Sequence, residues 1–364
     1  MAHTQSTSIP WIKTPLVRSA KLSREAGCNI YLKLENLQPS GSFKSRGIGS
    51  FILDHLQNSQ SQSQSSHAST NPDSKSKSHF YSSSGGNAGL GCVHAAVTLG
   101  CEATVVVPLT TSDYMISKLK DAGATGVIQH SASWVEADTY LREILVKRRD
   151  EGEDAVYVPP FDDPGVWSGH ATMVDEVLEQ LSEVQGHYAT GGDGHEEKGG
   201  DVKLDVVVCS VGGGGLFSGI MQGLSSPSLQ DTTKVLAVET RGADSLSQSL
   251  LARKLVTLPA ITSIATSLGA RTVCQRALDY GLQDNVTSVV VEDKEAVDAC
   301  KRFLDDERIL VEPACGAALA ICYEGRLRRV MPELREGSNV VIVVCGGSNI
   351  SFGILEKYRR DFGV

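Results

Sequence analysis

Short, strongly apolar runs alternate with longer amphipathic stretches along most of this 364-residue chain. Runs this short and rich in Val and Ile are typical of strands that are buried on both faces. Alternation of strands with helices over several hundred residues predicts βαβ units and therefore mostly parallel sheets. The predicted strands cover residues 29–34, 104–107, 205–211, 235–239, 289–292 and 339–345.

Two of the amphipathic stretches carry clear helix signals. The stretch 87–99 is followed by Gly100, a residue suited to the left-handed turn that ends many helices. In the stretch 166–184 the apolar positions recur at helical spacing, so they share one face. That face is formed by Val166, His170, Val174, Val177, Leu181 and Val184.

The length allows about two domains, and two open α/β sheets with a cleft between them are the simplest architecture. Ligands of such sheets bind beyond the carboxyl ends of the strands, in the loops that follow. The chemistry of this protein is therefore expected in those loops.

Composition and charge exclude several classes of function. The net charge is −9 and no basic stripe is present, so we expect no nucleic-acid partner. Nine cysteines without a C-x-x-C pair predict reduced, mostly buried thiols rather than disulfides or a zinc site. No apolar run approaches the length of a membrane span, and the N-terminus has no apolar targeting segment. We therefore expect a cytoplasmic protein that does not bind membranes.

Two polar segments interrupt the alternation. Residues 57–79 form a Ser/Gln tract and residues 186–201 are rich in glycine and polar side chains. Neither segment can bury enough apolar surface to offset the entropy lost on ordering, which predicts solvated insertions. The alternative is that they are binding loops, which seldom have such low complexity.

Four glycine-rich segments follow or adjoin the predicted strands, at 40–47, 82–89, 210–216 and 344–349. In the third, four consecutive glycines separate a buried strand from a helix start, which favours binding of a phosphate by converging N–H groups. A flexible turn is the alternative, although turns rarely need four glycines. Neither G-x-G-x-x-G nor a P-loop motif can be placed on these segments. The predicted phosphate therefore belongs to neither a dinucleotide nor a nucleoside triphosphate.

Lys44 lies in the first of these segments, directly after Phe43. Most lysines are solvated surface charges, and a lysine considered without its neighbours is interpreted as one of these. A desolvated amine in an apolar setting can instead have a lowered pKa and form a Schiff base. A lysine imine together with a phosphate site indicates pyridoxal phosphate.

The order of the motifs resembles that of the fold-type II pyridoxal-phosphate enzymes, and most closely the L-serine dehydratase (serine/threonine ammonia-lyase) branch. The resemblance extends over nearly the whole chain. It rests on SGSFKSRG at 40–47, SSGGNAG at 83–89, PPFDDPGVWSGH at 159–170, SVGGGGLFSG at 210–219, VETRGADS at 238–245, ITSIATSLGARTV at 261–273, VEPACGAALA at 311–320 and CGGSNIS at 345–351.

The resemblance implies a fold like that of the tryptophan synthase β subunit, with the cofactor in the cleft between the two sheets. It places residues 1–40 and 135–364 in a large cofactor-binding domain and residues 41–134 in a small domain. The two polar segments are then insertions, one in each domain. A homodimer is the expected assembly.

The resemblance also assigns roles to individual residues. Lys44 is expected to be the Schiff-base lysine and the base for the Cα proton, and Ser84 the second catalytic residue. Phe43 and Ser267 are expected to flank the pyridine ring, although the family often has Ala or Gly at the latter position. The substrate carboxylate is assigned to Ser84, Gly85, Asn87 and Ala88, with Asn87 also reaching the cofactor. The phosphate is assigned to Gly212, Gly213, Gly214, Gly215 and Leu216.

Cys345 falls where the family places the partner of the pyridine nitrogen. A carboxylate there would keep the nitrogen protonated, whereas a neutral thiol would not. The carbanion is then less delocalised and expels a β-leaving group promptly, which favours elimination over transamination or racemisation. The alternative is an inert core cysteine.

A monovalent cation, potassium, is a further expectation from the resemblance. Glu239 at a strand end could equally cap a helix or form a salt bridge. The cation shell would consist of Glu239, Ala243 and Ser245 with the backbone carbonyls of Gly212, Leu268 and Ala270, an oxygen set suited to a hard cation.

The implied reaction is deamination of L-serine to pyruvate and ammonia, and of L-threonine to 2-oxobutanoate, in amino-acid catabolism and gluconeogenesis. Serine racemase and threonine deaminase are the nearest alternatives, but they usually have a shorter S-x-G-N spacing than Ser84–Asn87 and a serine at the position of Cys345. A non-catalytic phosphate-binding protein is an alternative of another class, and the presence of Lys44 argues against it.

Overall fold

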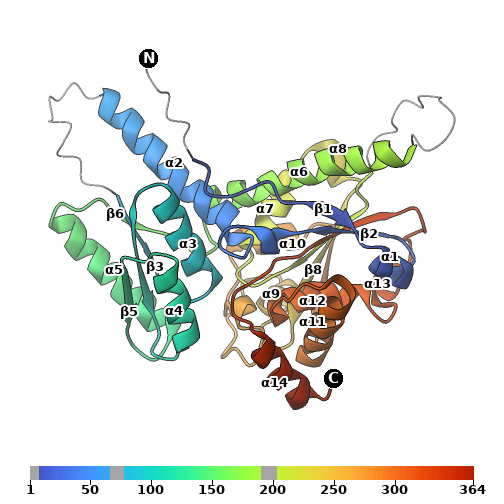
Figure 1. The fold of residues 1–364 in the computed structure, drawn as a ribbon. Coiled ribbons are helices and arrows are strands. Elements are labelled where there is room, and N and C mark those ends of the chain that lie inside the picture. The colour runs from blue at the N-terminus through green and yellow to red at the C-terminus, as the bar shows by residue number, and fades with distance from the viewer. Residues whose placement is uncertain (1–7, 66–77, 190–202) are drawn as a thin grey trace. The chain divides into compact units, whose positions relative to one another are not determined.

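The computed structural model describes residues 8–65, 78–189 and 203–364. The chain divides into two compact units, each built around one sheet. Unit 1 comprises residues 1–12 and 38–169, and unit 2 comprises residues 13–37 and 170–364. Both sheets are mostly parallel and flanked by helices, so the predicted α/β fold class is confirmed (Figure 1).

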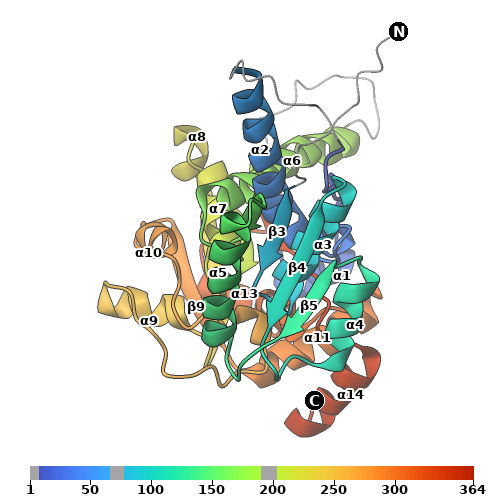
Figure 2. The ribbon, with the colours of Figure 1, turned by 90° about the vertical axis from the view of Figure 1, so that its left-hand side faces the viewer.

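Unit 1 contains a four-stranded sheet in the order β5-β4-β3-β6, in which all neighbouring strands are parallel. Figure 2 shows this sheet with α5 on one face and α3 and α4 on the other. Its strands are β3 (His79–Ser82), β4 (Glu102–Val107), β5 (Gly126–Gln129) and β6 (Ala155–Tyr157), and its helices are α2 (Lys44–Ser65), α3 (Asn87–Thr98), α4 (Asp113–Asp121) and α5 (Trp134–Asp150).

Alternating side chains of the strands fill two separate cores in unit 1. Phe80 and Val105 pack in a cluster with residues of α2, α3 and α4. The next residues along the same strands, Tyr81 and Val106, pack with Leu141 and other residues of α5. Burying each large apolar side chain contributes about 1.5–3 kcal/mol. Because successive side chains of a strand point to opposite faces, helices pack on both faces of the sheet. The loops at the strand ends are therefore left for binding.

Unit 2 contains a six-stranded sheet in the order β1-β2-β10-β7-β8-β9. Only the edge pair β1–β2 is antiparallel. The strands are β1 (Leu16–Arg18), β2 (Asn29–Lys33), β7 (Val206–Ser210), β8 (Lys234–Thr240), β9 (Val286–Val291) and β10 (Asn339–Val343). The helical segments are α1 (Ala20–Ala26), η1 (Glu35–Leu37), α6 (Pro164–Ala189, which begins in unit 1), α7 (Gly215–Gly223), α8 (Pro227–Gln230), α9 (Ser245–Ala252), η3 (Thr266–Leu268), α10 (Gln275–Gly281), α11 (Asp293–Glu307), α12 (Pro313–Leu319), η4 (Ala320–Cys322), α13 (Arg326–Val330) and α14 (Phe352–Phe362).

The centre of this second sheet is fully buried. Every residue of β7 and β10 is buried, and so is every residue of α12, which contacts both strands. Because β10, β7 and β8 are parallel neighbours, the loops after their carboxyl ends lie at the same edge of the sheet. These loops begin near residues 344, 211 and 241.

Each predicted strand overlaps a strand of the structure, whereas the short strands β1, β3, β5 and β6 were not predicted. Gly100 has a φ of 72° after α3, as the sequence predicted. In α6, five of the six predicted face residues are buried and Val184 is half-buried.

Several expected boundaries differ from the units of the structure, and residues 8–12 belong to unit 1 rather than to the larger unit. The chain passes into unit 2 at His170 rather than at 135, because β6 pairs with β3 and α5 covers the same sheet. The expected insertion at 57–79 begins in a helix, since α2 continues through Ser65, and its last residue, His79, opens β3. Residues 66–77 of that segment, and 190–201 of the second, lie outside the described residues.

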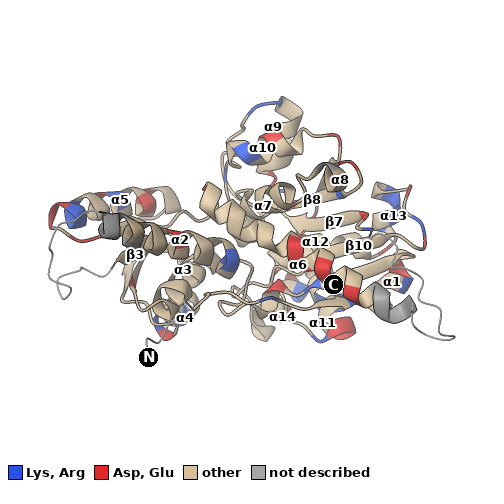
Figure 3. Ribbon diagram, turned by 90° about the horizontal axis from the view of Figure 1, so that it is seen from above, with Lys and Arg blue, Asp and Glu red and all other residues tan. Residues whose placement is uncertain are grey.

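The described part of the chain contains no helix long and apolar enough to cross a membrane. Acidic and basic residues are interspersed along α5 (Figure 3).

Candidate active site

Lys44 is the first residue of α2, and it lies against α3. A Cβ placed on Gly91 would be 3.2 Å from the Cβ of Lys44, so glycine there lets the two helices approach closely. The Lys44 Nζ donates a hydrogen bond to the carbonyl of Pro160, in the motif 159–170. The same Nζ lies 5.2 Å from the centroid of the Phe43 ring. The lysine and the aromatic ring predicted to hold the cofactor are therefore adjacent.

The predicted carboxylate loop lies between β3 and α3. Asn87 and Ala88 form the first turn of α3 and are buried, whereas Ser84 and Gly85 are half-buried. The Gly86 N–H donates to Ser84 Oγ at 3.3 Å. N–H groups at a helix N-terminus favour an anion, so this loop is suited to a carboxylate.

Close packing fixes the main chain of this loop. A Cβ on Gly89 would lie 1.9 Å from the carbonyl oxygen of Ser84, and a Cβ on Gly85 would lie 2.8 Å from Thr111. No larger residue fits at Gly89 without moving the carbonyl. The glycines of the motif 83–89 therefore set the position of Ser84 as well as the turn.

A buried carboxylate holds the same loop from the other side. Ser83 Oγ donates to Asp138 Oδ1 at 2.6 Å, and the Tyr157 hydroxyl donates to the same oxygen at 2.7 Å. Arg142 Nε donates to the other oxygen, Oδ2, at 2.8 Å. Burial raises the pKa of Asp138, but the hydrogen bonds from Ser83, Tyr157 and Arg142 outweigh it and leave the pKa below the usual value. The carboxylate is therefore ionised, and both of its oxygens accept hydrogen bonds.

In unit 2, the four glycines follow β7 and lead into α7. Gly214 has a φ of 92°, and a Cβ there would lie 2.4 Å from the Cβ of Ala277. A Cβ on Gly212 would lie 2.9 Å from the Cα of Leu268 and 3.1 Å from the carbonyl oxygen of Ser267. The structure therefore brings the predicted phosphate segment into contact with the predicted ring-flanking segment.

The segments that carry Ser267 and Cys345 are joined by a side chain to which the sequence motifs assign no role. Asn349 Nδ2 donates to Thr266 Oγ1 at 3.0 Å, and the Asn349 N–H donates to Glu312 Oε2 at 3.1 Å. Ser267 is the next residue in the η3 segment, and Cys345 precedes Asn349 in the loop after β10. Asn349 therefore links these two loops by a hydrogen bond.

Cys345 is buried near other thiols. Its Sγ donates to the carbonyl of Val343 at 3.6 Å. A hydrogen bond with Cys315 and burial together raise the pKa of the thiol well above its usual value. The group at this position is therefore a neutral thiol rather than a thiolate.

Glu239 is fully buried at the end of β8. Its two carboxylate oxygens accept hydrogen bonds of 2.8 Å from the N–H groups of Leu246 and Ser247, in the first turn of α9. Burial raises the pKa of Glu239 to about 8, against the opposing effect of these two bonds. Glu239 therefore caps the N-terminus of α9. A helix cap was one of the alternatives that the sequence left open for this residue.

The other residues of the expected cation shell lie on nearby segments of unit 2. The Ala243 N–H donates to Thr240 O at 2.9 Å, and the Ala270 N–H donates to Leu268 O at 2.8 Å. Ser245 is buried, and its carbonyl accepts a hydrogen bond of 2.6 Å from Ser249 Oγ. Among the described residues, no cluster of three or more His, Cys, Asp or Glu side chains could hold a metal ion.

The glycine segment fits the phosphate of a pyridoxal cofactor. The N-cap of α7 is Gly214, which has no side chain to cap the N-terminus of the helix. Its first N–H groups can therefore bind a phosphate, and side chains at Gly212 or Gly214 would disrupt the packing that shapes the segment. Within the described residues, the hydroxyl of Ser210, just before this segment, is buried without a hydrogen-bond partner, which is consistent with a polar group bound nearby.

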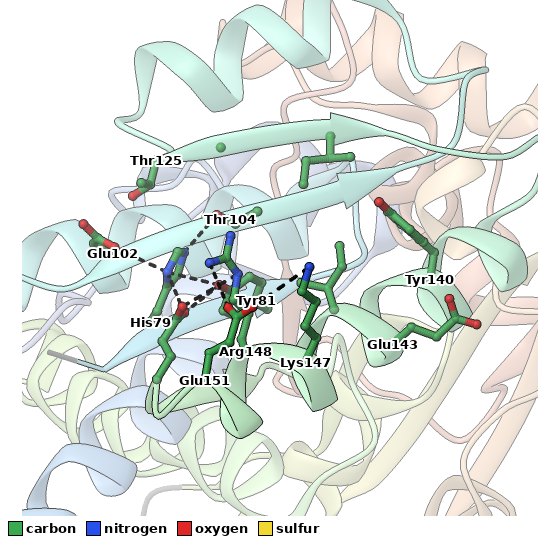
Figure 4. A pocket seen from close by; sticks show the side chains of 14 residues that line it. His79, Tyr81, Glu102, Thr104, Thr125, Tyr140, Glu143, Lys147, Arg148 and Glu151 are labelled. Atoms are coloured by element: carbon green, nitrogen blue, oxygen red, sulfur yellow. Dashed lines mark hydrogen bonds and ion pairs between the residues drawn. The ribbon is translucent and has the colours of Figure 1, made fainter. Parts of the chain in front are cut away.

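A cavity of about 800 Å³ lies elsewhere in unit 1 (Figure 4). It is at the amino ends of the strands, where His79 opens β3 and Glu102 opens β4, whereas Ser84 follows the carboxyl end of β3. His79 Nδ1 lies 3.3 Å from the carboxylate of Glu102 and 3.0 Å from that of Glu153, and Arg148 lies 3.8 Å from Glu153. None of the predicted site residues lines this cavity, whose lining carries four glutamates against Lys147 and Arg148.

Three residues that support the carboxylate loop were not predicted from the sequence, namely Ser83, Asp138 and Tyr157. Ser83 and Asp138 are 55 positions apart, and Asp138 and Tyr157 are 19 positions apart. No local motif marks such partners, since they meet only after β3, α5 and β6 have packed together. Asn349 lies in the motif 345–351, but its link to Thr266 also spans 83 positions.

The chain matches known proteins over nearly its full length. A family model described as "Pyridoxal-phosphate dependent enzyme" matches residues 8–346. The chain is 40% identical to the Homo sapiens protein "L-serine dehydratase/L-threonine deaminase" over 362 residues, which are 97% of this chain and 96% of the human protein. It is similar to the crystal structure of a fungal L-serine ammonia-lyase from Rhizomucor miehei, with a TM-score of 0.80 and 33% identity over 97% of this chain and 99% of that chain. It is also similar to maize serine racemase, with a TM-score of 0.75 and 25% identity over 96% and 92% of the two chains.

Proposed function

Because the chain belongs to the family of pyridoxal-phosphate dependent enzymes, we propose that it is an L-serine ammonia-lyase. It converts L-serine to pyruvate and ammonia, and L-threonine to 2-oxobutanoate and ammonia. The names of the human and fungal relatives support this reaction. The observation that carries the choice among the family's reactions is the match to dehydratase relatives over nearly the whole chain. The neutral Cys345 thiol further disfavours reactions that need a protonated ring nitrogen.

The bound cofactor would supply an electron sink for the negative charge that forms at the substrate Cα. Lys44 is the residue that would hold the cofactor, and its free amine would act as the base for the Cα proton. The N–H groups from Ser84 to Ala88 would bind the substrate carboxylate, and Phe43 and Ser267 are the residues proposed to hold the ring. Ser84 would be placed to protonate the departing β-hydroxyl, and the cofactor phosphate is the alternative proton donor.

The hydrogen bond between Lys44 and Pro160 supports this role for the lysine. It holds the Nζ beside the Phe43 ring and so restricts the rotamers that this long side chain can sample. A general base works best when its position is fixed within hydrogen-bond reach of the proton that it takes. The Pro160 carbonyl can also accept from the amine when the amine is released.

The finer predictions from the sequence belong to the same proposal. A potassium ion would bind Glu239 with Ala243, Ser245 and the carbonyls of Gly212, Leu268 and Ala270, and the protein would be a cytoplasmic homodimer. The buried Glu239 carboxylate supports a cation nearby, because a positive charge would stabilise its ionised form. Potassium should raise the melting temperature of the native protein more than that of Glu239→Gln; equal shifts would refute the cation site.

Serine racemase activity is the main alternative, given the similarity to the maize enzyme. A racemase must return the proton to the opposite face of Cα instead of losing the β-hydroxyl. A serine at position 345 would be as neutral as the Cys345 thiol, so neutrality there does not separate the two reactions. The longer Ser84–Asn87 spacing and the 40% identity to the human dehydratase, against 25% to the maize racemase, favour loss of the hydroxyl.

The test is to incubate the purified protein with L-serine and L-threonine and to measure pyruvate, 2-oxobutanoate and D-serine. The native protein should be coloured and should form pyruvate, and Lys44→Ala should form none. A colourless native protein would refute the cofactor. D-serine as the main product would establish the racemase instead, and colour without any product would favour a non-catalytic binding protein.

A further inference from the structure

Asp138 is a buried carboxylate that lies outside every motif on which the resemblance rests. Only 9% of the residue is exposed, and α5 carries it to the face of the sheet below the loop 83–86. A buried carboxylate is costly unless all its oxygens are paired. Here three donors from three segments meet it, namely Ser83, Arg142 and Tyr157.

The contact with Ser83 matters because of the place of Ser83 in the chain. Ser83 is fully buried and precedes Ser84, the first residue of the proposed carboxylate-binding segment. The hydroxyl–carboxylate distance of 2.6 Å is that of a strong, charge-assisted hydrogen bond. Asp138 therefore holds the residue immediately before the N–H groups that would bind the substrate.

The loop is held from a second side by α3. The carbonyl of Ser84 lies so close to Gly89 that it has no room to move toward the helix. The hydrogen bond from Ser83 to Asp138 ties the preceding residue to α5. Two consecutive residues are thus fixed by two different elements, α5 and α3.

We propose that Asp138 is a positioning residue that acts through Ser83 to hold the substrate-carboxylate loop in its binding conformation. The inference rests on the proposed function, because it takes the segment from Ser84 to Ala88 as the carboxylate site. It adds a residue on α5 that touches neither substrate nor cofactor. Binding sites lose affinity when such supporting contacts are removed, because the loop must then be ordered by the ligand.

Tyr157 provides a matched comparison, because it donates to the same oxygen of Asp138 as Ser83 does. Tyr157 ends β6 and is not part of the loop. Loss of its hydroxyl should weaken the packing around Asp138 while leaving the bond to Ser83 in place. A loss of folding stability alone would therefore appear in Tyr157→Phe as well as in the Asp138 variants. A loss of substrate binding through the loop would appear in the Asp138 variants and not in Tyr157→Phe.

The experiment uses the holoenzyme with Asp138→Ala, Asp138→Asn, Ser83→Ala and the double variant Ser83→Ala/Asp138→Ala. Asp138→Ala and Ser83→Ala should each raise KM for L-serine about tenfold, which corresponds to about 1.4 kcal/mol, with kcat changed less than about threefold. Asp138→Asn keeps an acceptor oxygen, so its KM should lie between those of the native protein and Asp138→Ala. The double variant should be no worse than either single variant, because both remove the same interaction.

The second readout does not depend on turnover. L-Alanine has the same α-carboxylate as serine but no β-leaving group, so its binding can be followed as a rise in melting temperature. The rise should be smaller in Asp138→Ala and Ser83→Ala than in Tyr157→Phe and in Asp150→Asn, a change at the exposed end of the same helix.

The outcomes separate this inference from the proposed function. If Asp138→Ala lowers the melting temperature as Tyr157→Phe does and leaves KM and the L-alanine shift unchanged, Asp138 has a structural role only and the inference is wrong. Additive effects of Ser83→Ala and Asp138→Ala would also overturn it. If the native protein forms no pyruvate, the proposed lyase fails, and the L-alanine shift still tests whether Asp138 supports a carboxylate site.

Discussion

The position of Gly89 determines where the carbonyl of Ser84 can lie, since a Cβ on Gly89 would be 1.9 Å from that oxygen. Real carbon and oxygen atoms that are not bonded stay well beyond this distance. The first turn of α3 and the loop before it therefore fit together only because residue 89 has no side chain.

Gly89→Ala should consequently displace the loop and weaken substrate binding. Overpacking of this kind costs about 1–3 kcal/mol of stability. We expect KM for L-serine to rise and the melting temperature to fall. Gly337→Ala is the control, because a Cβ placed on Gly337 would have no atom within 4 Å. Equal KM values for the two variants would contradict the packing argument.

Gly214→Ala should reduce affinity for the cofactor. Gly214 has a φ of 92°, and a Cβ there would lie 2.4 Å from the Cβ of Ala277, so alanine would displace the glycine segment. Gly152→Ala is a matched control, since Gly152 has a φ of 87° but no atom within 4 Å of its Cβ position. Titration of the cofactor-free proteins with pyridoxal phosphate should show at least about tenfold weaker binding for Gly214→Ala alone. The same affinity in both variants would mean that this segment does not hold the phosphate.

Cys345→Asp tests the link between the neutral thiol and elimination. A carboxylate would hold the ring nitrogen protonated and spread the negative charge further into the ring, so loss of the hydroxyl should slow by about tenfold or more. The fraction of D-serine or transamination products should rise. Cys345→Ser keeps a neutral group and should retain pyruvate formation within severalfold. An unimpaired Cys345→Asp enzyme would show that this position does not control the reaction.

The lowered pKa of Asp138 predicts how its contribution to stability depends on pH. The unfolded carboxyl has the ordinary pKa of 3.8, and the folded one lies below it. The unfolded state therefore binds the proton more tightly, and the contribution is complete above about pH 4 and is lost as the pH falls through the folded pKa. Urea unfolding should show a constant stability difference between native protein and Asp138→Asn from about pH 5 to 7, and a shrinking one below about pH 4. A difference that grows in acid would contradict the assigned hydrogen bonds.

Local sequence pattern was sufficient for the elements at the centre of the molecule. The strands β7 and β10 are continuous apolar runs, and the glycines that follow them mark the loops at one edge of the sheet. The short strands β3 and β6 could not be recognised in this way, because β6 has only three residues. The boundary expected at 135 differs from the unit boundary at 170 for the same reason, since only pairing with β3 assigns β6 to the first sheet.

In the candidate site, too, some residues could be predicted from local motifs and others could not. Lys44, the carboxylate loop and the glycine segment are each contiguous in the sequence, so their motifs could be read directly. Asp138 and Asn349 act on residues 55 and 83 positions away, and their roles depend on tertiary contacts. The alternatives for Glu239 also could not be separated by pattern, because a helix cap and a cation ligand need the same buried carboxylate.

The most direct test of the account is to reduce the purified native protein with sodium borohydride and to map the phosphopyridoxyl group by peptide mass spectrometry. The reduction turns the lysine–cofactor imine into a stable amine, so the modified residue can be identified. We predict modification of Lys44 alone, and none of the buried Lys33, whose Nζ lies 2.6 Å from the carboxylate of Glu176. A protein that carries no phosphopyridoxyl group, or carries it on another lysine, would contradict the central claim.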